Sequence, residues 1–180
     1  MGRVLDHIDD ATASWIETQH MFFVGTAPGE GGRVNLSPKG LDSFRVVGPT
    51  EIAYLDLTGS GAETIAHIRD NGRITIMFCA FEGPPRILRL YGTGSVHQPG
   101  DQRFGELSPL FPERRGVRSV ITASVERMQD SCGYSVPMMD FNGNRTRLDA
   151  WVESRSDEEI AAYWAARNAT SIDGLPALDM

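Results

Sequence analysis

The chain has 180 residues, 41% of them hydrophobic and 23% charged, a composition that indicates one globular domain over residues 1–180 and excludes a disordered or collagen-like protein. The formal net charge of −7 argues against a general nucleic-acid binder, because such a protein needs a basic face to displace counterions from phosphates. The longest apolar stretch, residues 74–81, is far shorter than the roughly 20 residues that span a bilayer. We therefore expect a cytoplasmic protein without a membrane segment.

The first 19 residues are predicted to form an N-terminal helix that packs as a lid. Leu5, Ile8, Ala11 and Trp15 recur at helical spacing, and aspartates occupy the early turns. Residues 28–32 are rich in glycine and predict a hairpin turn between the first two strands.

A series of short segments follows the helix, each rich in β-branched and aromatic residues and separated from the next by glycine or proline. The predicted strands are 20–27, 33–38, 44–47, 51–57, 73–81, 86–97 and 118–130. One helix, from about residue 61 to 71, interrupts the series, and Gly72 is placed to end it. Many antiparallel strands with short connections favour a mainly β, α+β fold, and a barrel best removes exposed strand edges.

Residues 150–180 are predicted to form a C-terminal helix and a docking tail. Ser156 and Glu159 form a capping box in front of a helix that runs to about Asn168. The tail at 171–176 is apolar enough to dock on the domain.

Two segments, 35–40 and 58–64, point to a bound anion. The second follows a strand and opens a helix, so its N–H groups and hydroxyls face whatever lies at the helix N-terminus. A phosphate monoester carries about −1.5 to −2 charges, and a helix end stabilises each by only about 0.3 to 1 kcal/mol, so a cation is needed. Lys39, the only lysine, and Arg89, inside an apolar strand, are candidates. The alternative, a lysine in a turn and a solvent-facing arginine on an edge strand, remains open.

Other chemistries find no support in the sequence. The chain has no Gly-x-Ser-x-Gly nucleophile motif, and its two cysteines lie 53 positions apart, which suggests reduced, buried thiols rather than a disulfide or a zinc site. Gly92 and Gly94 lie in a β-rich stretch and predict a strand bulge. No metal-ligand spacing relates the four histidines, which are His7, His20, His67 and His97.

The strand order and several motifs resemble the pyridoxamine 5'-phosphate oxidase-like family of flavin-binding split β-barrels. The resemblance covers about residues 20–134, and its motifs are MFFVGTA (21–27), NLSPKG (35–40), IAHIRDNGRITIMF (65–78) and LRLYG (88–92). The segments QDSCGYSVP (129–137) and SIDGLP (171–176) resemble a mostly uncharacterised subgroup. The resemblance implies an antiparallel FMN-binding split β-barrel with peripheral helices.

The same resemblance implies FMN bound where two subunits of a homodimer meet. It assigns the flavin edge to Asn35, Leu36, Ser37, Pro38 and Lys39 and the phosphate to Thr58, Ser60, Ala62 and Thr64. Lys39 and Arg89 would bring positive charge to the phosphate or to the N1 and C2 carbonyl edge of the flavin. The substrate side would be lined by Ser131, Cys132, Gly133 and Tyr134, from this subunit or its partner, although a packed core thiol is the favoured interpretation of Cys132 itself.

Two departures from the family pattern limit the expected activity. The family's oxidases carry a basic pair where this chain has Ala62 and Glu63, and they end in an Arg-x-His element that has no counterpart after Leu148. We therefore expect an FMN-dependent oxidoreductase that acts on an unidentified small molecule, with a nicotinamide or other donor, and not a pyridoxamine phosphate oxidase. The alternatives are a non-catalytic flavin or haem carrier and a deazaflavin-dependent reductase of the same fold.

Overall fold

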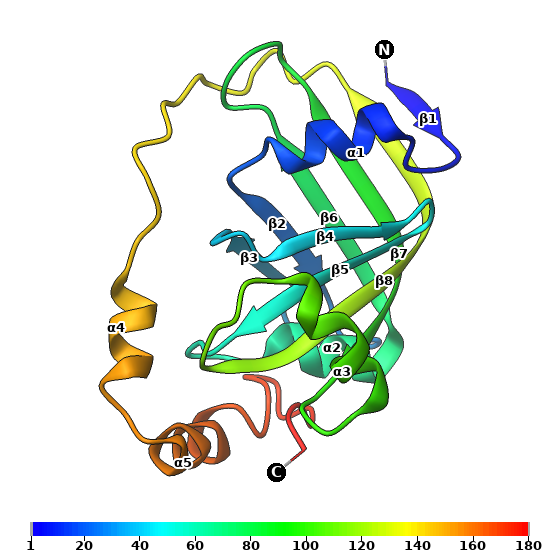
Figure 1. The fold of residues 1–180 in the computed structure, drawn as a ribbon. Helices are drawn as coiled ribbons and strands as arrows, with labels where there is room; N and C mark the ends of the chain where they lie inside the picture. Colours follow the sequence, from blue (N-terminus) through cyan, green and yellow to red (C-terminus); the bar gives the residue numbers. More distant parts are fainter. Residues whose placement is uncertain (1, 180) are drawn as a thin grey trace.

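The computed structural model describes residues 2–179 and consists of one curled antiparallel sheet with helices around it (Figure 1). The strands are β1 (Arg3–Leu5), β2 (Phe22–Thr26), β3 (Asn35–Lys39), β4 (Phe44–Gly48), β5 (Glu51–Leu57), β6 (Arg73–Cys79), β7 (Ile87–His97) and β8 (Val117–Ser131). The helices are α1 (Asp10–Glu17), α2 (Glu63–Asn71), α3 (Gln102–Leu107), α4 (Arg147–Glu153) and α5 (Asp157–Arg167), with a 3-10 turn η1 (Ser108–Leu110) after α3. The predicted mainly β, α+β class is confirmed.

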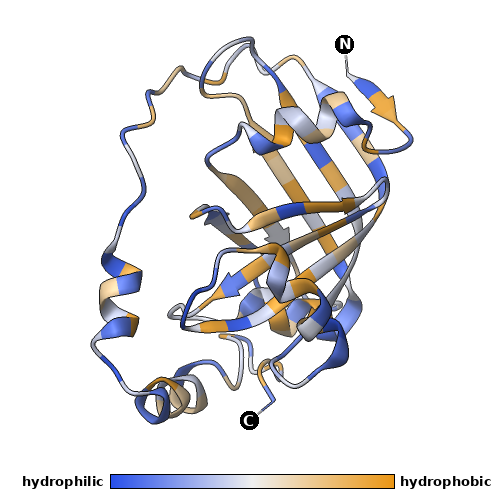
Figure 2. Ribbon diagram, in the orientation of Figure 1, coloured by the Kyte–Doolittle hydropathy of each residue, from blue (hydrophilic) through white to orange (hydrophobic). Residues whose placement is uncertain are grey.

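The sheet runs in the order β3-β2-β6-β7-β8-β5-β4, and β1 pairs with β8 beside this path. Strands from its two ends face each other across the interior, because the ring of Phe22 on β2 lies 4.9 Å from that of Phe44 on β4 and 5.5 Å from that of Tyr54 on β5. Hydrophobic residues alternate with more hydrophilic ones along β6 (Figure 2), and its buried residues recur at every second position up to Phe78, as expected for a strand with one buried face. The sheet therefore curls around a core.

The predicted bulge is confirmed between Tyr91 and Gly92, where the register of β7 against β8 shifts. Only glycine fits at position 92, because a methyl group there would run into the carbonyl oxygen of Ser124. The bulge increases the local bend of the two longest strands and helps the sheet to close.

Helices cover both ends of the barrel interior. Ile16 of α1 and Ile65 of α2 belong to the same buried cluster as Phe22 and Phe78, and α1 and α2 lie at opposite ends of the curled sheet (Figure 1). Gly72 ends α2 in a left-handed conformation with φ of 74°, as the sequence indicated. Of the helices within residues 2–179, none is long and apolar enough to cross a membrane.

The N-terminal prediction is wrong for its first half. Residues 3–5 form β1, and Leu5 pairs with Met128 of β8. The helix begins only at Asp10, because the side chain of Asp9 accepts a hydrogen bond from the N–H of Thr12 at 2.8 Å and so caps it there.

Two short helices were not predicted. The sequence predicts a single helix within the strand series, but α3 also lies there. Its last residue, Leu107, and Phe111 beyond it pack with Leu55 and Val120 on the outer face of β5 and β8. α4 was likewise missed. Each has fewer than eight residues, so its hydrophobic periodicity is too short to recognise.

The C-terminal prediction is confirmed. Ser156 and Glu159 form the capping box of α5, which ends at Arg167 with Asn168 as its C-cap. In the tail, Ala177 and Leu178 are buried in the barrel core. The tail therefore docks on the barrel, and the N–H of Ile172 donates a hydrogen bond to Glu63 at the start of α2.

Candidate functional site

A polar cavity of about 430 Å³ lies between β3, the end of β5 and the loop that leads into α2. Its lining includes six residues that the sequence analysis assigned to a cofactor, which are Asn35, Ser37, Pro38, Lys39, Thr58 and Ser60. The strand pairing explains this grouping, because Asn35, Ser37 and Lys39 alternate along β3 toward the barrel interior.

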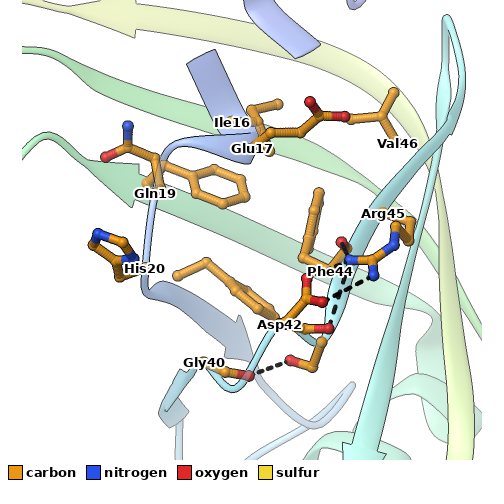
Figure 3. A pocket seen from close by; sticks show the side chains of 12 residues that line it. Ile16, Glu17, Gln19, His20, Gly40, Asp42, Phe44, Arg45 and Val46 are labelled. Atoms are coloured by element: carbon orange, nitrogen blue, oxygen red, sulfur yellow. Dashed lines mark hydrogen bonds and ion pairs between the residues drawn. The ribbon is translucent and has the colours of Figure 1, made fainter. Parts of the chain in front are cut away.

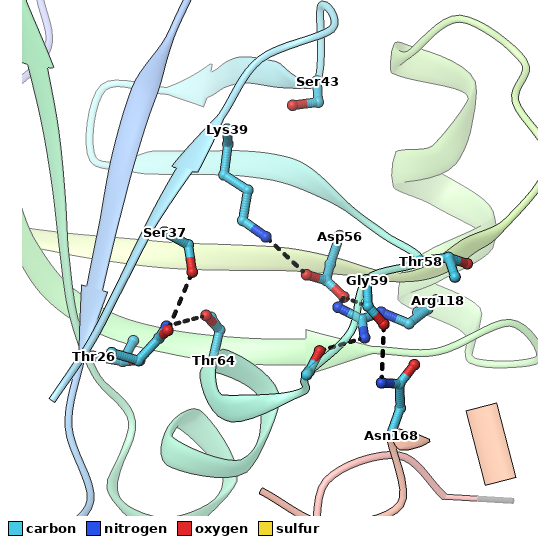
Figure 4. Close-up of polar contacts among 12 residues, drawn as sticks. Thr26, Ser37, Lys39, Ser43, Asp56, Thr58, Gly59, Thr64, Arg118 and Asn168 are labelled. Atoms are coloured by element: carbon cyan, nitrogen blue, oxygen red, sulfur yellow. Dashed lines mark hydrogen bonds and ion pairs between the residues drawn. The ribbon is translucent and has the colours of Figure 1, made fainter. Parts of the chain in front are cut away.

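A buried ion cluster forms one wall of the polar cavity (Figure 4). Asp56 is 1% exposed, and its Oδ2 accepts hydrogen bonds from Nε and Nη2 of Arg118 at 2.9 and 2.8 Å. Its Oδ1 lies 3.4 Å from Nζ of Lys39. Since two cations flank one carboxylate, the cluster retains one excess positive charge beside the cavity.

The sequence analysis missed both Asp56 and Arg118. A bulge between Asp56 and Leu57 shifts the register of β5 against β8 and aims Arg118 at Asp56, although strand alternation alone would have separated them. An available signal was the charge of Asp56 inside an apolar strand, the same signal that singled out Arg89.

Arg118 and the C-terminal region hold the loop before α2 in place. Nη1 of Arg118 donates to the carbonyl of Gly61 at 2.7 Å, and Nδ2 of Asn168 donates to the carbonyl of Gly59 at 3.2 Å. The hydroxyl of Thr58 donates to the carbonyl of Gly116 at 2.7 Å and accepts from Nε1 of Trp164 at 2.9 Å. The loop is thus tied to β8 and α5.

Two hydroxyls that the sequence analysis assigned to a phosphate are engaged within the protein. Besides Thr58, Thr64 accepts a hydrogen bond from Nδ2 of Asn35 at 2.9 Å. Ala62 is buried at the N-cap of α2 and provides no side-chain cap, while Ser60 is exposed. The groups available to an anion are therefore the first backbone N–H groups of α2 and the side chain of Ser60.

A hydrogen-bonded chain runs from the polar cavity into the core. The hydroxyl of Ser37 donates to Oδ1 of Asn35 at 3.2 Å. Further in, the hydroxyl oxygen of Thr26 lies 3.0 Å from Nδ1 of His67. His67 is fully buried, and its Nε2 has no hydrogen-bond partner among residues 2–179. Burial lowers the pKa of His67 from its ordinary value of 6.5, because the charged imidazolium loses its hydration.

Arg89 is not brought together with Lys39 within one chain. Its neighbours Leu88 and Leu90 point into the core, so Arg89 faces the outer side of the sheet, and β7 is the third strand from β3 in the sheet order. Lys39 instead faces the interior. The two cations therefore lie on opposite faces, because adjacent strand residues alternate.

The substrate-side group is also separate from the polar cavity. Residues 131–134 lie at the end of β8, the fourth strand from β3, and Gly133 packs against the backbone of Arg86. Cys132 is exposed, so the interpretation of it as a packed core thiol is wrong. Cys79 is buried as expected, and burial raises the pKa of its thiol.

Two further cavities meet the polar one at the turn after β3. The larger, about 810 Å³, is apolar and is lined by residues that include Trp15, Met21, Phe81 and Phe141. The smaller, about 310 Å³, lies between α1 and β4, where Arg45 and Asp42 form an ion pair of 2.7 Å (Figure 3). Gly40 lines all three cavities.

The turn at this junction is conformationally strained. Leu41 and Asp42 have φ values of 64° and 53°, in the left-handed region that residues with a side chain rarely adopt. Such conformations cost free energy and persist only where the surrounding structure enforces them. They occur most often at active sites and ligand sites. The junction of the three cavities is therefore the best candidate for a functional centre.

Comparisons with known proteins show the family of this chain. A family model described as pyridoxamine 5'-phosphate oxidase matches residues 8–132. The pyridoxamine 5'-phosphate oxidase family protein ustO of Aspergillus flavus is 40% identical, over 96% of this chain and 76% of that protein.

Solved structures share the fold. HupZ of Group A Streptococcus is 27% identical with a TM-score of 0.56, over 67% of this chain and 91% of that one. The FAD binding protein of Mycobacterium smegmatis is 8% identical with a TM-score of 0.50, over 71% of this chain and 97% of that one, which indicates the fold alone. The predicted split β-barrel is confirmed.

The buried ion pair predicts a large effect of Arg118→Met on stability. The substitution leaves Asp56 buried with only the longer contact to Lys39, so we expect the free energy of unfolding in urea to fall by about 3 to 5 kcal/mol. The matched control is Arg103→Met, which removes partly exposed contacts to Glu51 and Glu106 and should have a much smaller effect. Equal losses in the two variants would contradict the assigned role of Arg118.

The lowered pKa of His67 predicts a pH dependence of stability. Below pH 6.5 the unfolded chain protonates this histidine while the folded chain resists protonation, so the free energy of unfolding falls as the pH drops from 7 to 5. The free energy of unfolding of His67→Asn should fall less steeply with pH. The slope that remains includes the contribution of His97, because burial also lowers the pKa of that residue. Urea titrations at several pH values measure the slopes, and parallel curves would exclude His67 as their source.

Proposed function

This chain belongs to the pyridoxamine 5'-phosphate oxidase family, and from that premise we propose that it binds FMN and acts as an oxidoreductase on a small molecule. The observation that carries the proposal is the position of Lys39 and the uncapped N-terminus of α2 beside one polar cavity, which Asn35 and Ser37 also line. A flavin phosphate needs such a combination of a cation and free N–H groups.

The residues of the polar cavity fit the phosphate end of FMN in two respects. The N-terminus of α2 has no side-chain cap, so its first N–H groups can bind an anion. Lys39 is the cation free to move toward it, because its side chain is 21% exposed and its contact with Asp56 is longer than those of Arg118. One group, the carboxylate of Glu63, opposes the phosphate.

The chain's own residues would bind and orient the ligand. Asn35 and Ser37 present amide and hydroxyl groups on the interior side of β3, next to Lys39, where they can hydrogen-bond the polar edge of a flavin. Lys39 would stabilise negative charge that develops on that edge. A bound flavin supplies the electron transfer, which side chains alone cannot perform.

The adjoining apolar cavity is the proposed substrate side. It shares Pro38, Lys39, Gly40 and Leu41 with the polar cavity, so a molecule in it would lie beside the bound flavin. Its volume of about 810 Å³ and its aromatic lining are typical of small-molecule pockets and favour a hydrophobic substrate.

We also propose a homodimer that covers the outer face of the sheet around β3. Val34 and Leu36 are 79% and 66% exposed there, and β3 is an edge strand. Such neighbouring exposed apolar side chains are typical of interfaces. Arg89 and residues 131–134 are too far from the polar cavity in their own chain, and a second subunit is the arrangement that would bring them to it.

The second candidate is a non-catalytic flavin carrier. Of the described residues that line the polar cavity, none is a histidine, cysteine or tyrosine, and the ionisable ones are Lys39, Glu63 and Arg118, so none of its side chains has an ordinary pKa near 7. A carrier would bind FMN but would not pass electrons from it to a substrate.

The visible spectrum of the purified protein tests the cofactor. We expect absorbance at about 450 nm, bleaching by a nicotinamide donor without oxygen, and reoxidation by an acceptor. Bound flavin that cannot be reduced by any donor supports the carrier. A blue-shifted deazaflavin peak or a haem Soret band would replace FMN with one of the alternatives, and a colourless protein that does not take up added FMN contradicts the proposal.

Lys39→Met should raise the dissociation constant of FMN by about 10- to 100-fold, because it removes one charge-assisted hydrogen bond of about 1.5 to 3 kcal/mol. Fluorescence titration measures the constant. The matched control is Arg73→Met, which removes one positive charge from an exposed strand end outside the polar cavity. Equal affinity in the wild type and Lys39→Met would remove Lys39 from the site.

Leu36→Arg should convert the proposed dimer to a monomer, because a buried unpaired charge at an interface is strongly unfavourable. Light scattering after size-exclusion chromatography measures the mass. Leu110→Arg is the control, since Leu110 is also an exposed apolar residue, at 45%, but lies in η1 and not beside β3. A wild-type monomer, or a dimer that tolerates Leu36→Arg, would contradict this interface.

A further inference from the structure

Glu63 occupies the position at the start of α2 where an anionic ligand would bind. Its side chain folds back over the preceding loop, and Oε2 fills the space that a methyl group on Gly61 would need. Oε1 accepts a hydrogen bond from the N–H of Ile172 at 3.2 Å. The carboxylate also lines the polar cavity beside Ser60.

No cation neutralises this carboxylate within residues 2–179. Arg118 of β8 directs its Nη1 to the carbonyl of Gly61 and its other nitrogens to Asp56, while Arg33, which lines an adjoining cavity with Glu63, is paired with Asp173. Glu63 forms no ion pair with any described residue. Its full negative charge therefore faces the cavity and cancels the excess positive charge of the Lys39, Asp56 and Arg118 cluster.

The C-terminal tail fixes Glu63 in this position. Residues 171–175 form a tight turn in which the N–H of Ser171 donates to the carbonyl of Leu175 at 2.9 Å. Asp173 in the same turn accepts from the backbone N–H of Arg33 at 2.7 Å. Because the turn is attached to the barrel, the N–H of Ile172 keeps the carboxylate of Glu63 beside the helix end.

We propose that Glu63 determines ligand specificity by opposing a terminal phosphate, so that the cavity binds FMN and riboflavin with similar affinity. A helix N-terminus favours one nearby anion, and Glu63 already provides it. A phosphate monoester with about −1.5 to −2 charges would meet this carboxylate at close range. The inference rests on the proposed flavin function and adds that the flavin exchanges with free flavin rather than staying permanently bound.

The variant Glu63→Gln separates the charge of this residue from its structural role. Glutamine has nearly the same size, and its side-chain carbonyl can still accept the hydrogen bond from Ile172. The matched control is Asp70→Asn on the same helix, where the carboxylate accepts from the N–H of Gly29 at 2.5 Å. Asp70 is seven residues further on, about 10 Å along the helix axis, so its charge lies far from the phosphate position.

Fluorescence titration of wild-type protein and both variants with FMN and with riboflavin tests the inference. We expect the wild type to bind the two flavins within about threefold of each other. Glu63→Gln should tighten FMN binding by at least about tenfold and leave riboflavin within about twofold, because only FMN carries the phosphate. Asp70→Asn should retain the wild-type ratio.

Each other outcome has a distinct meaning. A wild type that prefers FMN by about 100-fold or more, or an FMN to riboflavin ratio that Glu63→Gln leaves unchanged, overturns the role of Glu63 while the flavin function stands. A protein that binds neither flavin overturns both. If thermal denaturation shows that Glu63→Gln is not folded, the ratio of the FMN and riboflavin dissociation constants of the wild type tests the inference by itself.

Discussion

The buried ion pair between Asp56 and Arg118 is the constraint on which the rest of the site depends. It joins β5 to β8 at a bulge, and the same guanidinium holds the carbonyl of Gly61, so the loop before α2 cannot move independently of the barrel. A buried pair of this kind contributes little net stability compared with apolar packing, but loss of one partner is strongly destabilising. The main effect of this ion pair is on geometry, because it fixes the N-terminus of α2 relative to β3.

The sequence alone is sufficient to predict those elements that are determined by neighbouring residues. The strand at residues 51–57, the capping box at Ser156 and the end of α2 at Gly72 each depend on a few neighbouring residues, and the structure has all three. The short helices α3 and α4 and the strand β1 depend on distant partners. Leu5 has helical spacing with Ile8, yet pairing with Met128 outweighs that local preference.

The same distinction applies to the site. Asn35, Ser37 and Lys39 could be grouped from sequence because they belong to one short motif, NLSPKG, and the structure adds that they share the interior side of β3. Arg118 could not, because a bulge reverses the face that alternation assigns to it. The hydroxyl of Thr58 satisfied the local rule for a phosphate contact but is held by Gly116 and Trp164, which lie 58 and 106 positions away.

Charge balance explains why family membership does not by itself define the ligand. Lys39 and Arg118 provide two positive charges around the polar cavity, and Asp56 and Glu63 provide two negative ones. A cavity that is neutral overall can still bind the apolar rings and polar edge of a flavin, since those groups need packing and hydrogen bonds rather than net charge. A neutral cavity binds a phosphate only weakly, and it therefore does not retain a phosphorylated cofactor tightly. The fold thus fixes where a flavin would lie, while Glu63 sets how firmly its charged end is held.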